Sequence, residues 1–142
     1  MYKYIFTVIN PDSEEAFKLA DSLSEKYSKL NWKKIDNLDY NDSSDVDLVV
    51  AIGGDGTILR AVSLAIKHDV PVLGINMGRV GFMTDIDGND ALKDFELYLD
   101  EKIRIEERAL IEVDFKIGKD HYNYKALNDI VIARGTSTSL IE

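Results

Sequence analysis

The stretch that decides the fold is DVDLVVAIGGDGTILRAVSLAIKHDVPVLGI, residues 45–75. Residues 45–52 end in a continuous apolar run, which is typical of a central strand covered on both faces. Residues 57–68 place apolar side chains at helical spacing, and Pro71 begins a second apolar run. The pattern therefore predicts a strand, a helix and a parallel strand, with a glycine-rich turn between the first two.

The segments on either side extend this unit into an α/β sheet. Residues 2–9 are rich in aromatic and β-branched side chains and predict a first strand. A helix follows, with Asp12 as its expected N-cap and Glu15 three residues further on. A second strand is expected at 31–36 and a helix near 89–99.

The pattern changes after residue 102, where helical spacing gives way to two long strands. Residues 103–117 and 121–134 predict a hairpin that turns at Gly118. We therefore expect residues 1–102 to form an open, mostly parallel, Rossmann-like α/β sheet and residues 103–142 to begin an antiparallel β-rich domain. Because a lone hairpin is marginal in water and leaves unpaired edges, we also expect a homo-oligomer.

Composition excludes several classes of function. The 142 residues are 45% hydrophobic and 30% charged, as in an ordinary folded domain. A formal charge of −9, from 26 acidic and 17 basic residues, argues against a nucleic-acid footprint. There is no cysteine, and His68 and His121 lack partners at metal spacing, so no metal-ligating residue is expected. No apolar run approaches the ~20 residues of a membrane span, which favours a cytoplasmic protein without membrane contact.

The loop GGDGT, residues 53–57, follows a predicted strand at the end where open α/β sheets bind ligands. Gly53 and Gly54 let the backbone approach a phosphate or ribose, and Gly56 and Thr57 open a helix whose N–H groups favour anions. Asp55 suits such a site if it accepts a proton from a hydroxyl that attacks phosphorus, or orients Mg²⁺ through water. Alternatively, Asp55 is a turn or cap residue and the glycines only shape a tight connection.

Three segments resemble, in order and spacing, the N-terminal motifs of bacterial NAD kinases: GGDGTILRA (53–61), NMGRVGFMTDI (76–86) and ALNDIVIARG (126–135). The first motif is shared with 6-phosphofructokinases and with diacylglycerol and sphingosine kinases. It therefore indicates only a superfamily of kinases, and the second and third motifs narrow the resemblance to NAD kinases. The resemblance implies transfer of the γ-phosphoryl group of ATP, with Mg²⁺, to the 2′-hydroxyl of the adenosine ribose of NAD. It also implies a dimer or tetramer.

The resemblance also implies roles for individual residues. Asp55 would serve the ribose 2′-hydroxyl as general base or orienting group, and the other residues of the GGDGT loop would surround the phosphates. Phe82 would cover the adenine, unless it is an ordinary core residue. Asn128 and Asp129 would contact the base and the ribose hydroxyls, because an amide and a carboxylate together suit a nucleoside.

Four further charged residues lie near these motifs. Arg60 and Arg79 are the cations nearest the two loops and could neutralise phosphate charge, although solvated arginines are common. Asp85 and Asp87 flank a turn and the next helix, where capping explains them.

The end of the chain departs from the family pattern. The family continues into a β-rich domain with a segment similar to STPTGSTAY, whereas this chain ends in GTSTSLIE, residues 135–142. We therefore expect a truncated N-terminal portion that is inactive alone. The alternatives are another GGDGT-type kinase acting on a lipid or sugar, and a non-catalytic nucleotide-binding fragment.

Overall fold

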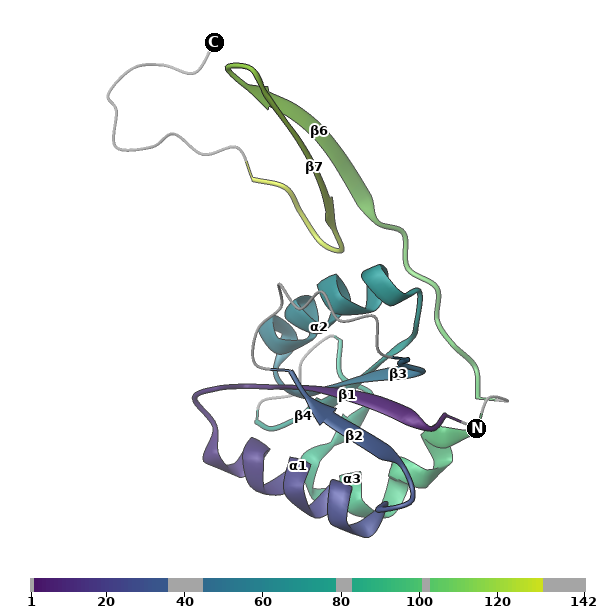
Figure 1. The fold of residues 1–142 in the computed structure, drawn as a ribbon. Helices are drawn as coiled ribbons and strands as arrows, with labels where there is room; N and C mark the ends of the chain where they lie inside the picture. The colour runs from purple at the N-terminus through teal and green to yellow at the C-terminus, as the bar shows by residue number, and fades with distance from the viewer. Residues whose placement is uncertain (1, 36–44, 79–82, 101–102, 132–142) are drawn as a thin grey trace. The chain divides into compact units, whose positions relative to one another are not determined.

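The computed structural model describes residues 2–35, 45–78, 83–100 and 103–131. The chain divides into two compact units, Met1–Ile105 and Glu106–Glu142, each of which is described by itself (Figure 1). In chain order, the elements are β1 (Tyr4–Ile9), α1 (Glu14–Lys26), β2 (Asn31–Lys34), β3 (Leu48–Gly53), α2 (Asp55–His68), β4 (Val72–Asn76), β5 (Ile86–Asp87), α3 (Gly88–Asp94), the 3₁₀ helix η1 (Phe95–Leu99), β6 (Ile111–Ile117) and β7 (Asp120–Ala126).

The first unit is built on a five-stranded sheet of order β2-β1-β3-β4-β5, in which every pairing is parallel. Helices α1 and α3 cover one face, and α2 covers the other (Figure 1). The predicted α/β sheet is thus confirmed. The two-residue strand β5 was not predicted, because two residues are too few to show a hydrophobic period.

All six residues of β3 are buried, which is the physical reason for its continuous apolar run. The sheet has one cluster of buried apolar side chains on each face. Alternate residues of β1 and β3 point to opposite faces, so each strand contributes side chains to both clusters. The cluster on the α1 and α3 side includes Ile5, Ile9, Val50 and Ile52, and the cluster on the α2 side includes Phe6, Val8, Val49 and Ala51.

Helix α1 begins one residue later than the sequence pattern indicated. Its N-cap is Ser13, whose Oγ accepts a hydrogen bond from the Ala16 N–H at 3.2 Å, so the prediction of Asp12 was wrong. The reason lies in Asn10, whose Oδ1 accepts from the Asp12 N–H at 3.1 Å while its carbonyl accepts from the Ser13 N–H at 3.2 Å. Asp12 is therefore part of a turn that precedes the helix.

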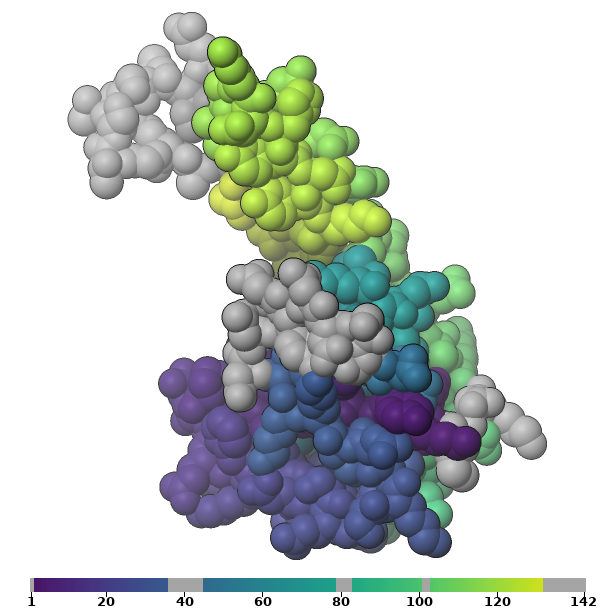
Figure 2. Space-filling model, viewed as in Figure 1, coloured from purple at the N-terminus to yellow at the C-terminus, as the bar shows by residue number. Residues whose placement is uncertain are grey.

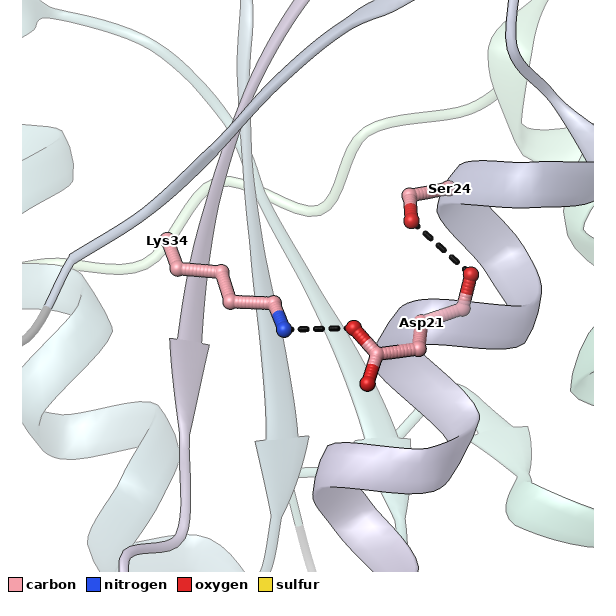
Figure 3. Close-up of polar contacts among 3 residues, drawn as sticks. All are labelled: Asp21, Ser24 and Lys34. Atoms are coloured by element: carbon pink, nitrogen blue, oxygen red, sulfur yellow. Dashed lines mark hydrogen bonds and ion pairs between the residues drawn. The ribbon is translucent and has the colours of Figure 1, made fainter.

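One exposed polar contact joins the outer strand β2 to α1, and a second lies within the helix (Figure 3). The Lys34 Nζ lies 2.5 Å from Asp21 Oδ1, and the Ser24 hydroxyl donates to the Asp21 backbone carbonyl at 2.8 Å. Trp32 of the same strand packs against Phe95, with ring centroids 5.5 Å apart.

None of the helices in the described part of the chain has the length and apolar character needed to span a membrane.

The second unit contains the predicted hairpin, which turns at Gly118 with φ +63. A positive φ at the first central residue of a two-residue loop is the geometry of a type II′ turn. The strands are shorter than predicted. The register pairs Ile111 with Ala126, and the described residues 127–131 form no strand that could pair with 104–110.

One face of this hairpin is apolar and largely exposed. Phe115 stacks on Tyr122 at 5.2 Å and on Tyr124 at 5.8 Å between ring centroids. In the space-filling view the described atoms of this unit, coloured green to yellow, form one continuous body (Figure 2). The opposite face carries charged and polar residues, so the hairpin is amphipathic.

Candidate functional site

The strand order places a topological switch point between β1 and β3. The chain leaves β1 through α1 toward β2 on one side, and leaves β3 through α2 toward β4 on the other. Open α/β sheets bind ligands outside the carboxyl ends of the two strands that flank this point. Here these ends are Asn10 and Gly53, held together by the Asn10 N–H, which donates to the Ile52 carbonyl at 2.9 Å.

The glycines of the loop at 53–56 differ in what packing demands of them. A Cβ on Gly53 would lie 2.3 Å from Thr57 Oγ1 and 3.0 Å from Asn10 Cβ, so only glycine fits there. A Cβ on Gly54 or Gly56 would meet nothing within 4 Å. Tight packing therefore accounts for the first glycine and leaves the other two unexplained.

Asp55 is the first residue of α2, whose N-cap is Gly54 with no side-chain cap. The helix therefore begins earlier than the predicted residue 57, and Gly54 rather than Asp55 occupies its N-cap position. The half-buried Asp55 carboxylate reaches the second motif, where its Oδ1 accepts the Met83 N–H at 3.2 Å. Thr57, which is buried, donates its N–H to the Gly54 carbonyl at 2.9 Å and closes the first turn.

The second motif begins beside the glycine loop. Asn76 pairs with Gly53 in the sheet, and the Met77 N–H donates to the Gly53 carbonyl at 3.2 Å. The Asn76 side chain is buried and bonds the backbone of Gly78 twice, as donor at 3.2 Å and as acceptor at 3.3 Å. Asn76 thus fixes the direction in which the chain leaves the sheet.

The two aspartates after this loop have different roles. Asp87 is the N-cap of α3 and accepts the Asn89 N–H at 2.9 Å, as the capping interpretation expected. Asp85 does not cap a helix, so that interpretation was wrong for it. Its Oδ2 accepts the Gly74 N–H of β4 at 3.0 Å, because β5 begins one residue later and brings Asp85 alongside Gly74.

The remaining predicted site residues are spread over the chain. Arg60 is half-buried on α2, and Arg79 and Phe82 lie outside the described residues. Asn128 and Asp129 are exposed residues of the second unit, and the Asn128 Nδ2 donates to Asp129 Oδ1 at 3.1 Å. Within the described ranges, no three His, Cys, Asp or Glu side chains gather as a metal site.

Sequence reasoning did not predict the contacts of three polar residues of this region: Asn10, Asn76, which opens the second motif, and Asp85, which was interpreted as a cap. Asn76 follows an apolar run and opens the second motif, so a polar residue at a strand end was an available signal. Asn10 and Asp85 gave no such signal, because their importance depends on which strands are neighbours in the sheet.

Together, the strand order and the loop define a class of protein: a doubly wound α/β domain with a glycine-rich strand-to-helix turn at its switch point. The family model described as the ATP-NAD kinase N-terminal domain matches residues 4–103. The chain therefore belongs to the ATP-NAD kinase family, and residues 4–103 are its N-terminal domain.

Individual relatives agree with this family. The chain is 32% identical over 148 residues to the NAD kinase of Heliobacterium modesticaldum, an alignment that covers 94% of this chain and 52% of the relative. It is 41% identical over 98 residues to the NAD kinase of Acinetobacter baylyi, covering 68% of this chain and 32% of the relative. The chain thus spans about half, or less, of the length of these relatives.

A solved structure supports the fold. The crystal structure of yeast NADH kinase complexed with NADH superposes with a TM-score of 0.67 and covers 87% of this chain and 46% of that chain. Sequence identity is 21%, so the likeness concerns the fold alone.

Proposed function

We propose that this chain is the N-terminal part of an NAD kinase, which transfers the γ-phosphoryl group of ATP to the 2′-hydroxyl of the adenosine ribose of NAD. The observation that carries the proposal is the position of Asp55. It stands at the first residue of α2, at the switch point of the sheet, and its carboxylate accepts a backbone N–H of the second motif. Family membership supports the same reaction.

In the proposed reaction, Asp55 accepts the proton of the ribose 2′-hydroxyl while the hydroxyl oxygen attacks the γ-phosphorus of ATP. A new oxygen–phosphorus bond forms, the bond from the γ-phosphorus to the β,γ-bridging oxygen breaks, and ADP leaves with the electron pair. The phosphates would approach the backbone at Gly54 and Gly56, where no side chain stands in the way and the helix N-terminus favours anions. Arg60, Arg79, Phe82, Asn128 and Asp129 stay predicted contacts.

Magnesium is compatible with the residues present. Mg²⁺ usually keeps several waters beside substrate phosphates, and Asp55, next to the loop that would receive the phosphates, would orient the ion through water. Mg²⁺ bound there would neutralise negative charge on the transferred group. We also propose a cytoplasmic protein that binds neither nucleic acid nor membrane; the formal charge of −9 argues against a nucleic-acid surface.

A substrate panel tests the proposed reaction. The whole protein is offered NAD, a diacylglycerol and fructose 6-phosphate in parallel, each with Mg-ATP, and products are separated by chromatography. We expect NADP alone. Phosphorylation of the lipid or the sugar without NADP would contradict the proposal in favour of another GGDGT-type kinase.

We expect the 142-residue chain by itself to be inactive, because it spans only about half the length of the relatives that it matches. NADP formation by the purified 142-residue chain at a rate near that of the whole protein would contradict this expectation. A parallel measurement of NAD binding by calorimetry separates lost catalysis from lost binding.

We also propose that the chain self-associates through its second unit. The exposed fractions of Phe115, Ile117 and Tyr124 are 40%, 63% and 56%, which is a large apolar surface for two strands. Covering it with a second copy would remove it from water. Sedimentation at increasing concentration should show association that Phe115→Ser weakens, and a monomer at all concentrations would contradict it.

A further inference from the structure

The Asp85 side chain takes the place of a main-chain carbonyl in the sheet. The Asp85 N–H donates to the Gly74 carbonyl at 2.8 Å, one residue before the β4–β5 pairing of Ile75 with Ile86. In a regular parallel ladder, a main-chain carbonyl of the segment that precedes β5 would accept the Gly74 N–H. Instead, the Gly74 N–H donates to Asp85 Oδ2 at 3.0 Å, so the carboxylate replaces that carbonyl.

This replacement releases the Met83 segment from the sheet. A Cβ on Gly74 would lie 2.9 Å from the Met83 carbonyl oxygen, 3.2 Å from Thr84 Cα and 2.7 Å from Ile58 Cδ1. The segment 83–84 therefore passes over Gly74 on the side where α2 packs. Glycine is required at 74 because any side chain would occupy this passage.

The same displacement brings Met83 to Asp55. Ile58 stands three residues after Asp55 on α2, so a segment that crosses Gly74 beside Ile58 runs toward the N-terminus of this helix. There the Met83 N–H donates to Asp55 Oδ1 at 3.2 Å. The two carboxylates are thus connected through Gly74 and the backbone of residues 83–85.

We propose that Asp85 is a positioning residue for Asp55. By accepting the Gly74 N–H, it holds segment 83–84 outside the sheet, and the Met83 N–H then fixes the orientation of the Asp55 carboxylate. The catalytic meaning of this arrangement rests on the proposed function, because a group that accepts a proton from substrate must be held in one geometry.

Amide hydrogen exchange tests the arrangement without any activity. In the 142-residue chain, Asp85→Ala should speed exchange at the Met83 amide about tenfold. Without Asp85, segment 83–84 is no longer held in place, and the Met83 N–H loses its bond to the Asp55 carboxylate. Asp85→Asn should stay close to the wild type, because its amide oxygen can still accept the Gly74 N–H. Asp87→Ala is the matched control, which loses the α3 cap but leaves Met83 unchanged.

Unchanged Met83 exchange in a folded Asp85→Ala variant would overturn the proposal. Should that variant fail to fold, Asp85→Glu provides the same test, because it keeps the charge and adds one methylene between the backbone and the carboxylate. We expect severalfold faster Met83 exchange in Asp85→Glu. A wild-type rate there would equally overturn the proposal.

Kinetics of the whole protein test the catalytic consequence. Asp85→Ala should lower kcat for NADP formation about tenfold to a hundredfold, with the Kd for NAD within about twofold of the wild type. Asp85→Asn should restore most of the rate, and adding Asp85→Ala to Asp55→Asn should cause no further loss. Independent, multiplying losses would contradict a shared path through Asp55.

The two proposals fail in different ways. If the proposed reaction is wrong, no variant forms NADP, yet Met83 exchange still responds to Asp85→Ala. If the positioning role is wrong, NADP forms at the wild-type rate in Asp85→Ala and Met83 exchange does not change.

Discussion

The strands of the two units differ in how far they are buried. All six residues of β3 in the first unit are buried, whereas six of the seven residues of β6 in the second are exposed and only Val113 is half-buried. Polar residues differ accordingly. Asp55, beside the covered sheet, bonds a backbone N–H that lies 28 residues away in the chain, while the exposed Asn128 bonds its neighbour Asp129.

The difference teaches how a site acquires definite geometry. Close packing on both faces of β3 fixes the backbone at its carboxyl end, so a side chain there meets the same partner in every molecule. The hairpin has only its two strands and one turn to fix it, and such hairpins are marginally stable. The first unit should therefore resist local change and lose much when its core is altered.

Removing core volume should show the contrast most strongly. Leu64 of α2 is 0% exposed, and Leu64→Ala should lower the free energy of unfolding by about 2–5 kcal/mol. Ile117 of β6 is 63% exposed, and Ile117→Ala should cost less than about 0.5 kcal/mol. Urea denaturation followed by circular dichroism measures both, and equal losses would break the comparison.

Alanine substitutions at Gly53 and Gly56 should have opposite effects on the free energy of unfolding. Gly53→Ala would place a Cβ 2.3 Å from Thr57 Oγ1, and should cost about 1–3 kcal/mol of unfolding free energy. Gly56→Ala meets no atom within 4 Å and lies in the first turn of α2, so it should stabilise by up to about 1 kcal/mol.

Nucleotide binding then distinguishes packing from function at the same loop. If the backbone at Gly56 approaches phosphate, Gly56→Ala should weaken ATP binding in calorimetry although its thermal stability rises. Destabilisation of Gly56→Ala, or unaltered ATP affinity, would speak against the proposed approach.

A change at the turn should affect the hairpin alone. Gly118 has φ +63, where an alanine is strained by about 1–2 kcal/mol, so Gly118→Ala should weaken cross-strand contacts between β6 and β7 in NMR spectra. Lys119→Ala is the control, since no described non-glycine residue other than Asp69 has a positive φ. A lower unfolding midpoint of the sheet unit in Gly118→Ala would contradict this local effect.

The smallest effect is expected at the surface of the first unit. The side chains of Lys34 and Asp21 are 42% and 61% exposed, so their ion pair is screened by water. Asp21→Ala should change the free energy of unfolding by less than about 0.5 kcal/mol, even in the more stable unit. A loss above about 1 kcal/mol would show that exposed contacts contribute more to the sheet than its packing suggests.

The sequence was informative where a local pattern determines local structure. The apolar run of β3 and the following amphipathic helix predicted the parallel sheet, and the glycine turn at 118 predicted the hairpin. Both features show in a few consecutive residues, because burial on two faces requires a continuous apolar run and a positive φ favours glycine.

Other features depend on contacts between distant residues. Ser13 rather than Asp12 caps α1 because Asn10 bonds the backbone of the intervening turn. Asp85 accepts a backbone N–H of Gly74, eleven residues earlier in the chain, and no periodicity reports such a bond. The position of the Asp55 loop was predictable from its strand, but the bond from Met83 to its carboxylate was not.

The most direct test of the role of Asp55 is the turnover of Asp55→Asn in the whole protein. The amide oxygen of asparagine can still accept the Met83 N–H, so the variant should fold and keep a Kd for NAD within about twofold of the wild type. Loss of the proton acceptor should lower kcat for NADP formation about 10²- to 10⁴-fold. Turnover equal to the wild type, with ATP and NAD at saturation, would contradict a role for this carboxylate in the reaction.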